Sequence, residues 1–199
     1  MRAFVIAMKC EAACVRPWLR AGDRLYVCGI GKVNAAAAAQ RAICEGADEI
    51  WNAGLCGGFG DQVEVGGVYA VGQAVEYDFD LAQLNGTRVG QLDGFDTPYF
   101  PCAPLGAPCI RASLTLATGD RFNDSEADYE LIVKDLGASL RDMEGAAIAQ
   151  VCLRAGVPCF AVKCVTNVAG GGSMTGQYLS NRERCLASLS SALGEILGV

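Results

Sequence analysis

The sequence contains no histidine at any of its 199 positions. This absence excludes Ser-His-Asp and Cys-His catalysis, and it also excludes a zinc site built on histidine ligands. Any acid–base chemistry must therefore use carboxylates, lysine, tyrosine, cysteine or water. We expect a protein that needs neither a metal ion nor an organic cofactor.

Basic charge and long apolar runs are also scarce. Lys and Arg number 16 against 22 Asp and Glu, giving a net charge of −6. Because a nucleic-acid partner needs a basic face, we expect none, whereas a small neutral nucleoside or sugar is compatible with this charge. No apolar run approaches the ~20 residues of a membrane span, and the one after Arg2 is too short for a signal peptide. We therefore expect no membrane association.

Cysteine is abundant, yet the pattern of a disulfide scaffold is missing. The 11 cysteines are odd in number and form no CxxC pair, and many lie inside apolar runs, as Cys28, Cys152 and Cys164 do. Buried, reduced thiols explain this pattern better than secreted disulfides. The sequence therefore predicts a cytoplasmic protein.

The chain is predicted to form one domain, residues 1–199, of α/β type. Strands are expected at 3–8, 25–28, 48–52, 65–71, 73–81, 110–117 and 159–165, and helices at 12–18, 33–44, 125–136 and 181–197. Strand, glycine turn and helix alternate in the first part, as in parallel α/β architectures. The polar stretch 85–108 is predicted to be a loop or lid over a site.

The stretch 141–147 opens a helix with apolar residues on one face, and Gly156 and Pro158 end it. Glu144 then lies at a helix entrance, and Asn167 lies where the next strand ends. Open α/β sheets bind ligands at the carboxyl ends of their strands. An equally good interpretation of Glu144 is structural, as a capping or first-turn acid that the helix dipole favours. This stretch alone leaves both interpretations open.

Two glycine-rich segments, 29–32 and 53–58, also follow predicted strands. The first has neither Walker A spacing nor a complete GxGxxG, so each segment alone is well explained as a strand-to-helix turn. The turns at Asp120 and Asn167 follow strands as well. All four turns are therefore expected to converge at one edge of the sheet.

Six short motifs occur in a characteristic order: MKCE at 8–11, GIGKV at 29–33, NAGLCGG at 52–58, GDRF at 119–122, DMEGAA at 142–147 and VTNV at 165–168. Together they resemble the purine nucleoside phosphorylase/uridine phosphorylase superfamily, and most closely the methylthioadenosine/S-adenosylhomocysteine nucleosidases. The resemblance implies a three-layer α/β/α sandwich around a mixed central sheet, in a homodimer or larger homo-oligomer. It also implies cleavage of the bond between a purine and ribose C1′, through an oxocarbenium-like transition state.

Motif position implies a role for each polar or aromatic residue of the site. Glu11 would position the attacking water, and Glu144 would accept hydrogen bonds from the ribose hydroxyls. Met143 would pack under the sugar, and Phe122 would stack on the base. These residue types suit those tasks, because a carboxylate accepts hydroxyl protons and an aromatic face suits a purine. The full prediction is Glu11 and Asn167 as catalytic residues, with Leu55, Cys56, Phe122, Asn123, Asp142, Met143 and Glu144 binding the substrate. A pocket for a 5′ substituent would be lined by the 85–108 loop and by residues near Met174 to Tyr178, with a partner subunit as a further option.

The glycine segments help to decide whether water or phosphate is the nucleophile. A phosphorylase needs a phosphate cradle, but the apolar side chain of Leu55 cannot donate a hydrogen bond to an oxyanion and the first glycine segment offers only Lys32. Hydrolysis is therefore favoured, with a phosphate-dependent phosphorylase as the alternative.

Asn167 stands where the nucleosidases that the chain resembles have an aspartate that protonates N7 of the leaving adenine. Asparagine can donate a hydrogen bond but has no proton to transfer. Asn167 would then select a 6-oxopurine, or another acid such as Asp120 or a water would serve, or the protein would be a catalytically silent nucleoside-binding relative. Lys163 is expected to be structural or a carboxylate partner, with an orienting role toward Asn167 or Asp120 as a further option.

Overall fold

The computed structural model describes residues 1–122 and 125–198. Its strands are β1 (Arg2–Ile6), β2 (Arg24–Val27), β3 (Glu49–Gly58), β4 (Val68–Glu76), β5 (Phe100–Pro101), β6 (Ser113–Thr118), β7 (Leu140–Asp142) and β8 (Cys159–Val168). Its helices are α1 (Lys9–Val15), α2 (Lys32–Cys44), α3 (Ala82–Asn85), α4 (Glu126–Glu130), α5 (Gly145–Ala155) and α6 (Met174–Leu197). A short 3₁₀ helix, η1 (Arg16–Trp18), follows α1, and a π-helical segment, η2 (Leu131–Asp135), follows α4.

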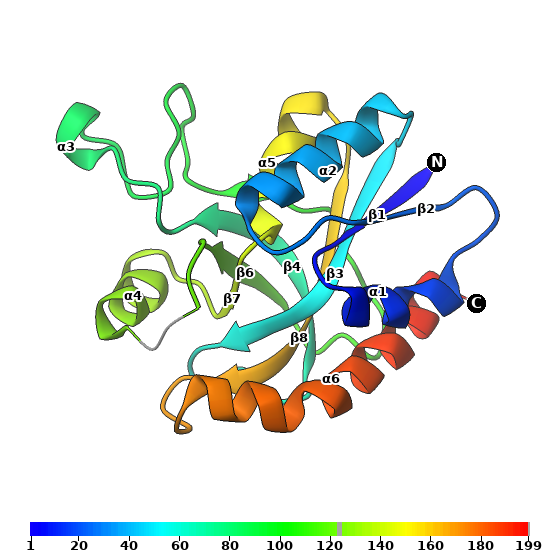
Figure 1. Cartoon of the computed structure of the whole chain (residues 1–199). Coiled ribbons are helices and arrows are strands. Elements are labelled where there is room, and N and C mark those ends of the chain that lie inside the picture. Colours follow the sequence, from blue (N-terminus) through cyan, green and yellow to red (C-terminus); the bar gives the residue numbers. More distant parts are fainter. Residues whose placement is uncertain (123–124, 199) are drawn as a thin grey trace.

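The strands form one mixed sheet that closes partly on itself. Strand β1 pairs in parallel with β2 and β3, and β3 pairs with both β8 and β7. Strand β4 joins β8 to β6, and β6 pairs with β7, which completes a ring of β3, β8, β4, β6 and β7. Helices α2 and α5 cover one face and α1 and α6 cover the other (Figure 1). This arrangement confirms the predicted three-layer α/β/α fold.

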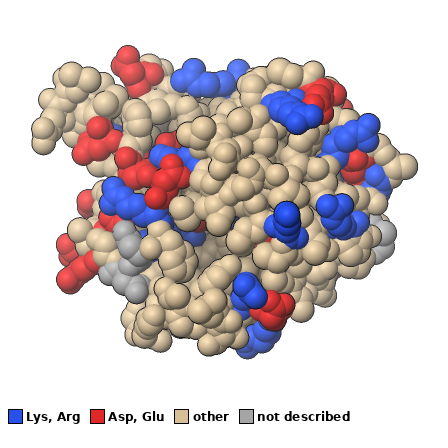
Figure 2. Space-filling model, viewed as in Figure 1, with Lys and Arg blue, Asp and Glu red and all other residues tan. Residues whose placement is uncertain are grey.

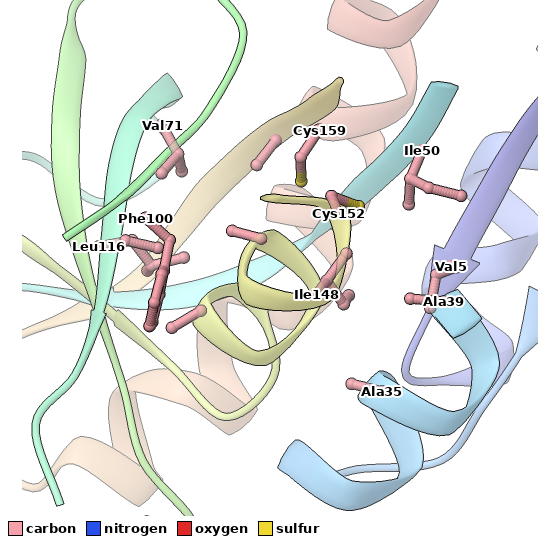
Figure 3. Close-up of a cluster of buried hydrophobic side chains, with 14 of the residues drawn as sticks. Val5, Ala35, Ala39, Ile50, Val71, Phe100, Leu116, Ile148, Cys152 and Cys159 are labelled. Atoms are coloured by element: carbon pink, nitrogen blue, oxygen red, sulfur yellow. The ribbon is translucent and has the colours of Figure 1, made fainter. Parts of the chain in front are cut away.

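Small side chains bring α2 and α5 close to the sheet. Ala35 and Ala39 of α2 are fully buried, as are Ile148 and Cys152 of α5. Figure 3 shows these residues packed beside the aliphatic side chains of the strands. The alanine-rich sequence therefore gives a thin helix layer, which holds the N-terminus of α2 close to the ends of the central strands.

Strand β3 is longer than its sequence predicted. The segment 53–58 was expected to be a glycine turn after a short strand, but it continues β3 and pairs with β8 up to Gly58. Its glycines have no positive φ, so they do not serve turn formation. A Cβ on Gly58 would lie 2.8 Å from Val63 Cγ2, so glycine is needed there for space. The turn prediction for this segment was wrong.

Other boundaries differ from the sequence predictions in simpler ways. The two strands expected at 65–71 and 73–81 form one strand, β4, with an irregularity between Val71 and Gln73. Helix α6 begins at Met174, because the Ser173 hydroxyl caps it by accepting from Gly176 N. Residues 85–108 are mostly irregular, as predicted, apart from the short strand β5.

Candidate functional site

A cavity of about 380 Å³ lies where β1, β3, β7 and β8 meet the N-terminal ends of α1 and α5 and the first turns of α6. The predicted site residues Glu11, Leu55, Cys56, Phe122, Asp142, Met143, Glu144 and Asn167 all line it. The remaining one, Asn123, lies outside the described residues. The structure therefore brings the predicted residues together from distant parts of the chain.

Glu11 lies in the first turn of α1, and its carboxylate is fixed by two backbone donors. Its Oε2 accepts from Met8 N at 3.1 Å, and its Oε1 accepts from Leu55 N at 2.8 Å. The residue is 3% exposed. Burial raises the pKa of Glu11, against the opposing effects of the Leu55 hydrogen bond and the Lys163 charge. The result is a rigid, buried carboxylate with increased affinity for a proton.

Gly54 of β3 provides the space for this carboxylate. A Cβ at that position would lie 2.7 Å from Glu11 Oε1, and Gly54 has no positive φ that would favour glycine. Glycine at position 54 therefore has a steric rather than a conformational reason.

We predict that Gly54→Ala displaces the Glu11 carboxylate and lowers turnover by about 100-fold, the usual effect of a 1 Å misplacement. Unfolding free energy should fall by only about 1–3 kcal/mol, as for local overpacking. Gly106→Ala is the matched control, because nothing lies within 4 Å of a Cβ there. Equal turnover in both variants, measured by initial rates, would contradict the role given to Gly54.

Glu144 begins α5, but its side chain does not cap that helix. The carboxylate reaches across to the glycine segment, where Oε1 accepts from Gly31 N at 2.9 Å. Burial, followed by the charge of Asp142, raises the pKa of Glu144 to about 7. Of the two interpretations that the sequence left open, capping by the Glu144 side chain is wrong. The carboxylate instead faces the cavity beside the start of α2.

Asp142 is the residue that caps α5. Its Oδ1 and Oδ2 lie 3.2 and 2.9 Å from Gly145 N, and Oδ1 also accepts from the Thr118 hydroxyl at 2.6 Å. Its Oδ2 pairs with Lys163 Nζ at 2.8 Å, with both side chains only 2% exposed. Protein donors therefore engage both oxygens. This geometry favours a positioning role for Asp142 over the direct substrate contact that the sequence predicted.

Lys163 supplies the positive charge beneath the cavity. Burial lowers the pKa of Lys163, but the charges of Asp142 and Glu144 outweigh it and hold the pKa above its usual value. The ion pair confirms Lys163 as a carboxylate partner. Its charge also attenuates the repulsion among Glu11, Asp142 and Glu144.

The N-terminus of α2 is occupied by the protein's own carboxylates. Gly31 N donates to Glu144, and Lys32 N donates to Asp120 Oδ1 at 2.9 Å. Free N–H groups at a helix N-terminus commonly bind phosphate. Here those two donors are already engaged.

The Lys32 ammonium is also engaged, away from the cavity. Its Nζ lies 2.6 Å from Asp78 Oδ1 and 3.0 Å from Glu76 Oε2. Lys32 is not among the residues that line the cavity, and neither is Asp120, the alternative acid. The first glycine segment therefore offers no cation for a phosphate.

A β-bulge directs Asn167 into the cavity. Cys56 pairs with Val165 and Gly57 pairs with Asn167, so Thr166 is an extra residue in β8. Side chains alternate along a regular strand, but a bulge can turn two neighbours toward one face. Thr166 and Asn167 both line the cavity, and each is 1% exposed. Among the described residues, Asn167 Nδ2 has no hydrogen-bond partner, which marks it as a donor for a ligand.

Apolar groups form the opposite wall. Phe122 is 52% exposed and makes an edge contact with Tyr178, with ring centroids 5.9 Å apart. Met174 and Tyr178, which were predicted to line a pocket for a 5′ substituent, do line the cavity. Residues 85–108 were predicted to line it too, but none of them does. Residues 100–101 of that segment form β5, which pairs with β4.

Three cavity-lining residues carry chemistry that the sequence analysis did not assign. Thr166 supplies a hydroxyl, and Arg121 and Arg141 supply guanidinium groups. Arg141 is buried, lies over the Phe59 ring at 5.6 Å, and donates to Met174 Sδ at 3.6 Å. The sequence offered one sign of Arg141, since this charged residue lies directly after the apolar Leu140 and directly before the motif that begins at Asp142.

Comparison with known proteins identifies the family of this chain. The family model of the phosphorylase superfamily matches residues 24–197. The chain belongs to the phosphorylase superfamily. This confirms the resemblance carried by the six motifs.

Within the superfamily, the chain is similar to several nucleosidases. It is 31% identical over 157 residues to the 5′-methylthioadenosine/S-adenosylhomocysteine nucleosidase of Shewanella halifaxensis, covering 73% of this chain and 68% of the relative. The first curated relatives are matched over 66–68% of their own length, so the aligned part is about two thirds of those proteins.

Solved structures of the superfamily share the whole fold. The adenine-bound nucleosidase of the same name from Colwellia psychrerythraea has a TM-score of 0.85 at 26% identity, covering 100% of this chain and 95% of that one. Futalosine hydrolase of Helicobacter pylori has a TM-score of 0.86 at 18% identity, covering 99% and 97%, which shows fold similarity alone.

The charges on one face of the molecule are mixed. On the face seen in Figure 2, the Lys and Arg of the described residues are interspersed with Asp and Glu, without a continuous basic surface. None of the helices in residues 1–122 and 125–198 is long and apolar enough to cross a membrane.

Proposed function

We propose that this protein is a purine nucleosidase, which uses water to cleave the bond between a purine base and ribose C1′. The observation that carries the proposal is the composition of one cavity. Two buried carboxylates, Glu11 and Glu144, share it with the aromatic ring of Phe122 and the buried amide of Asn167. The named activity of the curated relatives supports the same reaction. A homodimer or larger homo-oligomer in the cytoplasm remains part of this proposal.

The two carboxylates have different tasks in this proposal. Glu11 holds the attacking water and takes its proton, which suits a carboxylate whose pKa is raised toward the working pH. Glu144 accepts hydrogen bonds from the ribose hydroxyls, using the oxygen that Gly31 does not engage. Met143, next to it in the chain, packs under the sugar.

Water is favoured over phosphate as the nucleophile. The N–H groups of Gly31 and Lys32 already bind carboxylates, and the Lys32 ammonium is neutralised by Glu76 and Asp78. A phosphate dianion would meet the buried carboxylates Glu11 and Glu144 without a cation from this segment to balance them. Phosphorolysis is therefore the weaker candidate.

Asn167 supports a preference for 6-oxopurines. Its unpartnered Nδ2 can donate to N7 or O6 of a base such as hypoxanthine, both of which are acceptors. It cannot supply the proton that helps adenine to leave.

We expect Asn167→Asp to shift the ratio of turnover toward adenine nucleosides by about 10²-fold or more, because a general acid typically contributes 10²–10⁴. Thr166 Oγ1 lies 2.8 Å from Asn167 Oδ1 and would retain its contact with the new carboxylate. Steady-state kcat/KM for inosine and for methylthioadenosine measures the shift. An unchanged ratio would remove Asn167 as the selector of the base.

The proposed function is tested with purified protein and a panel of nucleosides: inosine, futalosine, methylthioadenosine and S-adenosylhomocysteine. Release of free base from at least one, without phosphate, is the expected result, with inosine or futalosine preferred. Nucleoside binding without turnover would instead indicate a catalytically silent relative.

A further inference from the structure

The bulge in β8 places a buried hydroxyl between two acceptors. Thr166 Oγ1 lies 2.8 Å from Asn167 Oδ1 and 3.1 Å from the backbone oxygen of Cys56. A threonine hydroxyl has one proton, so it donates to only one of them at a time. Both acceptors belong to the protein, so its own atoms set the direction of this proton.

The two positions of this proton present different atoms to the cavity. When Thr166 donates to Asn167 Oδ1, the amide is held with Nδ2–H toward the ligand. When Thr166 donates to Cys56, its oxygen can only accept, so the Asn167 amide turns over and places Oδ1 toward the ligand. One hydroxyl thus decides whether the cavity offers a donor or an acceptor.

Purine bases distinguish these two states. A 6-oxopurine presents acceptors at N7 and O6, whereas a 6-aminopurine presents an acceptor at N7 and a donor at N6. The donor state suits the first class, and the acceptor state suits the amino group of the second. A mismatched buried polar pair is costly, so the amide orientation affects base selection.

We propose that Thr166 is a specificity-setting positioning residue, whose hydroxyl holds Asn167 in its donor orientation and thereby favours 6-oxopurines. The shorter contact, to Asn167, supports this state. Glycine at position 57 leaves room for it, because a Cβ there would lie 3.1 Å from Asn167 Nδ2. This inference rests on the proposed function, since it refines how the same cavity selects its base.

The test uses equilibrium binding of free hypoxanthine and free adenine, which needs no turnover. Thr166→Val removes the hydroxyl at nearly constant shape, and Thr166→Ser retains it. We expect the ratio of hypoxanthine to adenine affinity to fall by roughly three- to tenfold in T166V, the value of one hydrogen bond, and to change less than about twofold in T166S. An unchanged ratio in T166V overturns the inference.

A second measurement on the unmodified protein covers the case in which T166V does not fold. With ¹⁵N-labelled protein and ¹³C,¹⁵N-labelled hypoxanthine, a scalar coupling from Asn167 Nδ2 to base N7 or C6 is expected across the hydrogen bond. A hypoxanthine complex in which Asn167 Nδ2–H makes no hydrogen bond to the base contradicts the proposal. Binding of neither base and turnover of no nucleoside would refute the proposed function itself, and this inference with it. Turnover with unaltered base preference in T166V refutes only the role of Thr166.

Discussion

Replacing Glu11 by glutamine should lower the rate of nucleoside hydrolysis by about 10³-fold, because the variant loses the group that takes a proton from water. The rate constant under single-turnover conditions is the direct measure, since it excludes product release. Substrate affinity should change little, because the proposed mechanism places Glu11 against the water rather than against the base or the ribose hydroxyls.

Glu11→Gln should also lower the stability of the protein, and this effect must be measured separately from the loss of catalysis. Both oxygens of Glu11 accept backbone N–H groups, from Met8 and from Leu55. A glutamine can satisfy only one of them, so we expect a loss of about 1–3 kcal/mol in unfolding free energy. Retained hypoxanthine binding would show that the cavity is intact. A turnover loss of less than about tenfold in such folded protein would show that Glu11 is not the base.

Replacing Glu144 by glutamine should raise KM by roughly 10- to 100-fold, since hydrogen bonds to a charged group are worth about 1.5–3 kcal/mol. The same substitution should weaken substrate binding but increase the stability of the fold at neutral pH. Glu144 has a pKa raised to about 7, so its stabilising contribution is complete below the unfolded value of 4.5 and is lost as pH rises through about 7. E144Q should therefore become more stable relative to the parent between pH 4.5 and 8, by up to about 3 kcal/mol.

Asp142→Asn is the matched control for this experiment, because Asp142 lies on the same turn but caps α5 and pairs with Lys163. Breaking that buried ion pair should cost about 3–5 kcal/mol at neutral pH. Thermal unfolding of both variants across this pH range separates the two carboxylates. A sharp fall in the melting temperature of E144Q, similar to that of D142N, would restore the capping interpretation of Glu144.

Part of the site could be predicted from the order of strands and turns alone. Glu144 and Asn167 were predicted near the ends of strands, and the ends of central strands converge in an α/β sheet. The place of Glu11 in the site came instead from the resemblance that the six motifs carry. The sequence could not decide which acid caps α5. Asp142 and Glu144 both lie near the helix start, and the choice depends on side-chain orientation and on Lys163, which lies 21 positions from Asp142 in the sequence.

The glycines of β3 show a second limit of sequence interpretation. A run such as Ala53-Gly54-Leu55-Cys56-Gly57-Gly58 is typical of a turn, because glycine tolerates positive φ. Here Gly54 and Gly57 remain extended, and the missing side chains leave room for Glu11 and Asn167. The sequence cannot show this reason, because the side chains that need the space come from distant parts of the chain and meet the glycines only in the folded protein.

The central claim is hydrolysis by a water that Glu11 holds, in a cavity whose first glycine segment has no free N–H group or ammonium at Gly31 and Lys32 for a phosphate. Its most direct test is the initial rate of inosine cleavage in phosphate-free buffer, followed by titration with phosphate and identification of the sugar product. We predict a rate that does not depend on phosphate, with free ribose as the product. A rate that is zero without phosphate and rises with its concentration, together with ribose 1-phosphate as the product, would contradict it.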